Sequence, residues 1–189
     1  MEEQSFYSFD YLISINEKRA EQYLTAYQKV IERFTNIILI YSAITIFLIP
    51  IIQDIFFGEV KSVIMYICFV LFAGLFLTSL VFTIKLIIPV QVAYLDAPEK
   101  YYKEIRIQYE QNNPGLDEKA INKLIKGSYI LELEEAVKVN NTLFKRKSSF
   151  FYNSLLFGLL CAIPYMVCLG YHISKKDKSV QQIEIVNHK

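Results

Sequence analysis

Three long stretches almost free of charged side chains constrain this sequence more than any other feature. They cover residues 37–57, 62–84 and 149–173. About 20 apolar residues in a helix that rises 1.5 Å per residue cross the hydrocarbon core of a bilayer. Hydrophobic residues make up 53% of the 189-residue chain, which is more than a small soluble domain buries. The sequence therefore predicts an all-α membrane protein with about three transmembrane helices and a cytoplasmic helical domain.

The first two stretches are predicted to form a transmembrane hairpin within residues 35–92. About four to eight residues separate them, and Gly58 in this segment permits a tight turn. Lys85 follows the second span and is expected to extend toward the lipid headgroups. Pro89 has no backbone N–H and is expected to end or kink the helix.

The third stretch, residues 149–173, holds Pro164 at its middle and is followed by a polar tail over residues 174–189. Proline removes one backbone hydrogen bond, which inside lipid must be replaced by neighbouring groups. The sequence favours a single span kinked at Pro164. A re-entrant pair of half-helices is the alternative.

The remaining segments read as helices outside the lipid. Residues 1–34 contain an amphipathic helix, with apolar residues spaced by three and four, that is expected to run unbroken into the first span. Residues 93–148 form a second helical region, in which a helix over 97–111 is followed by a turn at 113–115. A further helix is expected to start at Leu116 or Asp117 and to continue into the third span.

Orientation follows from lysine and arginine, because short basic segments resist translocation. These residues concentrate in 1–34 and 93–148, so both segments are predicted to be cytoplasmic. Three spans then place the tail on the opposite side, although it carries Lys175, Lys176 and Lys178. The net charge of +1 argues against broad contact with nucleic acid.

Motifs for catalysis or cofactor binding are missing from the sequence. Its six glycines are scattered, and its two histidines, His172 and His188, lie near the end of the chain. Cys168 and His172 share a helix face, but two unrelated residues at a membrane boundary explain them better than a metal site. Glu132, Glu134 and Glu135 are interpreted as a solvated helix face. We expect no enzyme, no cofactor and no bound metal.

Candidate residues for assembly lie within and beside the spans. Gly74, Thr78 and Ser79 form a small, mildly polar stripe where helices of neighbouring copies could pack closely or line a pore. Amide side chains predicted to bond between helices are Asn140, Asn141 and Asn153. The basic residues predicted to anchor at the membrane surface are Lys145, Arg146 and Lys147.

The layout resembles that of small membrane effectors of bacterial anti-phage systems, notably SLATT-type domains. The features that carry the resemblance are the amphipathic helix ending at Phe34, the hairpin closed by Gln53 to Val60 and the long charged helices beyond Tyr94. The layout is also similar to that of the small membrane accessory proteins of type VI CRISPR loci. The third span departs from the two-helix SLATT pattern.

The resemblance implies a homo-oligomer in the bacterial inner membrane that permeabilises or depolarises it when a cytoplasmic protein or a nucleotide signal triggers it. A non-enzymatic scaffold that docks a cytoplasmic partner is the first alternative. A small channel or transporter subunit is the second. The polar residues in the middle of the predicted spans can bond their own backbone, and this disfavours a transporter that acts as a monomer.

Overall fold

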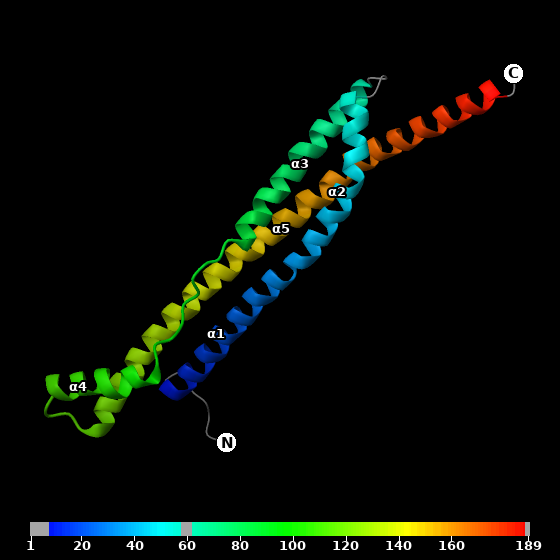
Figure 1. Cartoon of the computed structure of the whole chain (residues 1–189). Helices are drawn as coiled ribbons and strands as arrows, with labels where there is room; N and C mark the ends of the chain where they lie inside the picture. The colour runs from blue at the N-terminus through cyan, green and yellow to red at the C-terminus, as the bar shows by residue number, and fades with distance from the viewer. Residues whose placement is uncertain (1–7, 58–61, 188–189) are drawn as a thin grey trace. The chain divides into compact units, whose positions relative to one another are not determined.

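Helices account for all regular structure in residues 8–57 and 62–187, the part of the chain that this computed structural model describes. In chain order they are α1 (Phe9–Glu32), α2 (Phe34–Phe57), α3 (Val63–Ile87), the π-helical η1 (Lys100–Ile105), α4 (Arg106–Asn112) and α5 (Glu118–Asn187). Figure 1 shows this order along the chain. The predicted hairpin turn at Gly58 lies outside the described residues.

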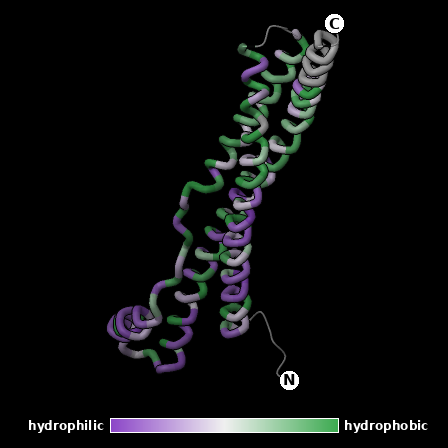
Figure 2. Tube along the Cα trace, turned by 45° about the vertical axis from the view of Figure 1, so that its right-hand side comes forward, coloured by the Kyte–Doolittle hydropathy of each residue, from purple (hydrophilic) through white to green (hydrophobic). Residues whose placement is uncertain are grey.

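The chain divides into two compact units. The first, here called the helical unit, comprises Met1–Lys29 and Pro89–Ser148. The second, the apolar unit, comprises Val30–Ile88 and Ser149–Lys189. Figure 2 shows hydrophobic residues along α2 and α3, whereas α1 and α4 are largely hydrophilic.

In the apolar unit, the predicted spans 37–57 and 62–84 fall within α2 and α3. Together with α5, the described part of the chain has three helices long and apolar enough to cross a membrane, which confirms the predicted fold class. Fewer than a third of the residues in each apolar window are buried, so most of this surface is available to lipid. α3 ends at Ile87, directly before Ile88 and Pro89, as the proline predicts.

The junction between α1 and α2 differs from the unbroken helix that the sequence predicts. Arg33 forms a turn between Glu32 and Phe34, and the Asn36 N–H donates to the Arg33 carbonyl at 3.2 Å. This three-residue spacing is tighter than an α-helical turn. The interruption is one residue long.

α5 is a single helix through the third span. Pro164 lies inside it without interrupting it, and the helix continues beyond the predicted span to Asn187. Figure 1 shows a change of direction within the orange stretch of α5. This is consistent with the predicted kinked span.

A cluster of buried apolar residues joins the three helices of the apolar unit. The Phe72 ring stacks on Phe76 and packs against Tyr165, with ring centroids 5.5 Å apart in both pairs. The buried members are Ile51, Ile55, Met65, Phe72, Cys161, Tyr165 and Cys168. Cys68, Cys161 and Cys168 are free thiols.

In the helical unit, an extended segment over residues 89–97 precedes a helix that begins at Pro98. The helix predicted over 97–111 is thus confirmed to within one residue at each end, although its first part is η1. The turn at 113–115 is also confirmed. The Asp117 side chain accepts a 2.9 Å hydrogen bond from the Ala120 N–H and caps α5, which starts at Glu118.

Candidate functional site

The three residues of the predicted stripe on α3 face different surroundings. Gly74 is exposed, and a Cβ atom built on it meets nothing within 4 Å. The Thr78 hydroxyl donates to the Gly74 carbonyl at 2.8 Å. Ser79 is fully buried inside the apolar unit. Packing between copies through Gly74 and Thr78 stays a prediction, whereas Ser79 is already used within one copy.

Ser79 belongs to a group of four buried hydroxyls, here called the hydroxyl cluster, which joins α2, α3 and α5. The Tyr41 hydroxyl contacts Ser79, and it lies 3.0 Å from Thr83 Oγ1 and 3.2 Å from Ser154 Oγ. Ser79 donates to the Ser154 carbonyl at 2.5 Å, and the Thr83 and Ser154 hydroxyl oxygens are 2.5 Å apart. These groups satisfy one another, as buried polar groups in an apolar environment require.

Gly158 on α5 makes this close approach possible. A Cβ at this position would lie 3.3 Å from Ser79 Oγ and 3.8 Å from Tyr41 Cε1. Beside the cluster is a cavity of about 20 Å³, bounded in part by Tyr41 and Ser154. That volume holds about one water molecule. Side chains therefore fill the space between α2, α3 and α5 around the hydroxyl cluster, apart from this small cavity.

An ionisable pair joins α2 and α5 within the apolar unit. His172 Nδ1 lies 2.5 Å from Asp54 Oδ2, and both side chains are 23% exposed. The Cys168 thiol instead donates to the Met65 carbonyl at 3.9 Å. Among the described residues, no group of three or more potential ligands could hold a metal ion. His172 thus pairs with a carboxylate rather than with Cys168.

The predicted amide residues occupy two units. Asn140 is buried in the helical unit, where its amide accepts from the Ala93 N–H at 3.0 Å and donates to the Ala93 carbonyl at 3.1 Å. The partner of Asn140 is thus the extended segment rather than a neighbouring helix. The side-chain amide has one acceptor oxygen and an NH₂ donor, so it can bond both the N–H and the carbonyl of one backbone residue. Asn141, in the same unit, and Asn153, in the apolar unit, are half-buried.

The basic residues predicted as a surface anchor do not share one environment. Lys145 and Arg146 are exposed, but Lys147 is 1% exposed. Consecutive helical residues point about 100° apart, which is why three neighbours in sequence cannot all face one surface. Burial, and then the nearby Arg146 charge, lowers the pKa of the Lys147 amine. Lys145 and Arg146 have the exposure that contact with headgroups requires, and anchoring through them stays a prediction.

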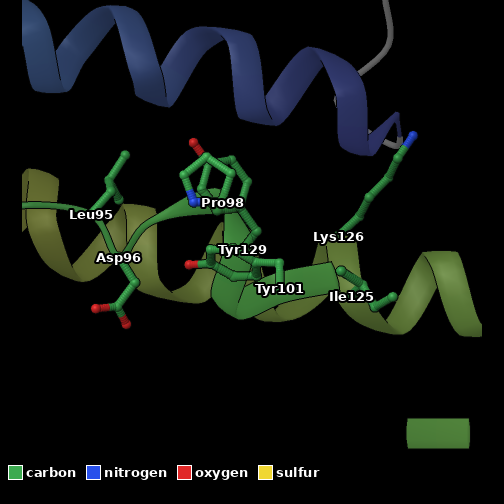
Figure 3. A pocket seen from close by; sticks show the side chains of 7 residues that line it. All are labelled: Leu95, Asp96, Pro98, Tyr101, Ile125, Lys126 and Tyr129. Atoms are coloured by element: carbon green, nitrogen blue, oxygen red, sulfur yellow. The ribbon is translucent and has the colours of Figure 1, made fainter. Parts of the chain in front are cut away.

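A cavity of about 480 Å³ lies in the helical unit (Figure 3). Its walls are mostly apolar and come from the extended segment, η1 and α5. The lining residues are Leu95, Asp96, Pro98, Tyr101, Ile125, Lys126 and Tyr129. The Tyr101 and Tyr129 rings meet edge to face, with centroids 5.1 Å apart and planes at 83°. This volume and lining are typical of sites for small molecules.

Carboxylates hold both tyrosine hydroxyls of the cavity. Tyr101 donates to Glu132, and Tyr129 donates to Glu17 of α1 at 2.7 Å. Burial and then the Glu17 hydrogen bond raise the pKa of Tyr129 to about 12, and burial and Glu132 likewise raise the pKa of Tyr101. Glu132 also accepts from the Asp96 N–H at 2.8 Å. Its assignment to a solvated face is therefore wrong, while Glu134 and Glu135 are exposed as predicted.

Opposite charges stand at the edges of the cavity. Lys126 Nζ lies 2.6 Å from Asp10 Oδ1 of α1, and Asp96 forms an ion pair with Lys100. Sequence reasoning missed this site. The available signal was the pair Pro89 and Pro98, which bracket a segment that can pack as an extended chain.

No protein-family model, curated protein or solved structure shows a match to this chain.

Proposed function

We propose that this chain is an oligomeric membrane effector that acts without catalysis. Several copies assemble in a bacterial inner membrane and permeabilise or depolarise it when the helical unit is triggered. The layout resembles that of small anti-phage membrane effectors, which supports antiviral defence as the biological setting. Lysine and arginine concentrated in residues 1–34 and 93–148 favour a cytoplasmic helical unit.

The observation that carries the proposal is the outward position of Gly74. The hydroxyl cluster and the aromatic core fill the apolar unit where α2, α3 and α5 meet. A permeation path then runs between copies rather than through one copy. Gly74 and the half-buried Thr78 offer a face of α3 where a second backbone can approach closely.

Replacing Gly74 by leucine tests this proposal. Leucine blocks close approach between helices, yet it favours insertion into hydrocarbon. We expect Gly74→Leu to abolish dye entry or loss of membrane potential on expression, while the amount of protein in the membrane stays normal. Gly170→Leu is the matched control, because Gly170 of α5 is equally exposed with nothing within 4 Å of a built Cβ.

Two results decide the matter. Loss of permeability with Gly74→Leu alone supports assembly through α3. Wild-type permeability with Gly74→Leu refutes it. The cavity of the helical unit would then favour the second candidate, a non-enzymatic scaffold whose cavity receives a cytoplasmic partner.

A further inference from the structure

The cavity of the helical unit combines an apolar interior with a cationic edge. We propose that it binds a small anionic amphiphile, with an apolar body packed against the Tyr101 and Tyr129 rings and a carboxylate on Lys126. This inference stands apart from the proposed function, because it concerns the residues of the helical unit alone.

The interior selects an apolar body. Leu95, Pro98 and Ile125 supply aliphatic walls, and the Tyr101 and Tyr129 rings supply an edge-to-face aromatic pair. Both tyrosine hydroxyls already donate to carboxylates. Neither hydroxyl proton is therefore free to bind a polar body, whereas an apolar body needs no such donor.

The edges of the cavity select a negative head group. Figure 3 shows Lys126 and Asp96 on opposite sides of the tyrosine rings, with Lys126 reaching toward α1. Lys126 Nζ already holds a carboxylate oxygen, that of Asp10, at 2.6 Å. A ligand carboxylate presents the same chemistry. At the opposite edge, the Asp96 carboxylate is already paired with Lys100.

Exchange of Asp10 for the ligand is energetically accessible. The Lys126 and Asp10 side chains are 44% and 74% exposed, and ion pairs this exposed contribute little to stability. Binding would release α1 from α5 at this point. The nearby hydrogen bond from Tyr129 to Glu17 would still connect α5 to α1.

Photolabelling of the full-length protein in lipid nanodiscs tests the inference. The probe is 4-benzoylbenzoate, a photoreactive aromatic carboxylate, and its uncharged methyl ester is the matched probe. Mass spectrometry gives the labelling of the peptides that hold Tyr101, Ile125 and Tyr129, relative to labelling of α2 and α3 in the same sample. We expect the acid to label the cavity about two- to fivefold more than the ester, because an ion pair to an exposed lysine adds only modest affinity.

Three variants separate binding from folding. Lys126→Met should lower cavity labelling by the acid about two- to fivefold, to the level of the ester, and Lys123→Met, one turn away and exposed, should leave it unchanged. Asp10→Asn removes the competing carboxylate and should raise labelling severalfold, which a misfolded variant would not do. Equal labelling by acid and ester, or wild-type labelling of Lys126→Met, would overturn the proposal.

Discussion

The hydroxyl cluster makes a quantitative prediction for Tyr41→Phe. The substitution removes one hydroxyl that contacts Ser79, Thr83 and Ser154. That hydroxyl carries a single proton, so it can donate only one hydrogen bond among these contacts. Ser79 still donates to the Ser154 carbonyl, and Thr83 still contacts Ser154, so each remaining hydroxyl keeps a partner. Hydrogen bonds between membrane helices contribute about 0.6 to 2 kcal/mol. We expect a loss of about 1 kcal/mol in the free energy of unfolding.

Unfolding in mixed micelles of increasing SDS fraction, followed by near-ultraviolet circular dichroism, measures this loss. Tyr152→Phe is the control, since Tyr152 is 64% exposed and should change stability by no more than about 0.3 kcal/mol. A double-mutant cycle of Tyr41→Phe with Ser79→Ala should give a coupling energy of about 1 kcal/mol. Additive effects of the two substitutions would refute the shared hydrogen bond.

Three further predictions follow from other parts of the chain. Because the pKa of Tyr129 is raised from 10.0 to about 12, its stabilising contribution is complete below pH 10 and is lost as pH rises through about 12. Glu17→Gln should lower that pKa, which alkaline titration of absorbance at 295 nm would reveal. Asn140→Ala should cost about 1 to 2 kcal/mol and speed hydrogen exchange at Ala93, while Asn141→Ala should leave this exchange unchanged. Light scattering in mild detergent should give several times 22.1 kDa, and a monomer would contradict assembly.

The sequence predicts the helices well, because each depends on local pattern. Apolar length defines the spans, Pro89 predicts the end of α3, and the turn at 113–115 predicts the start of α5. The bonds of the Tyr41 hydroxyl, by contrast, reach side chains 38, 42 and 113 positions away. Serine and threonine in a span can bond their own backbone, so their presence in the sequence does not reveal which of them face another helix.

The same limit applies to the cavity. Tyr101 and Tyr129 meet because the chain reverses direction at the turn 113–115, so that Tyr109 contacts Ser128 and Tyr101 donates to Glu132. The Asn140 amide holds the segment before η1 through Ala93, which lies 47 positions earlier. The helical pattern around Tyr101 or Tyr129 gives no sign that the two rings meet. The interpretation of Glu132 as solvated was wrong for this reason, since its partners, Tyr101 and Asp96, lie in a different segment.

The continuity of α5 makes a last prediction, about topology. A re-entrant pair of half-helices requires a break near Pro164, but α5 continues through this residue to Asn187. A helix that enters the bilayer on one face and does not turn must leave on the other. Three crossings then place Lys189 on the side opposite to residues 93–148. A reporter inserted near Asn113 should report the cytoplasm and one fused after Lys189 the periplasm, so a cytoplasmic signal from the second fusion would refute three spans.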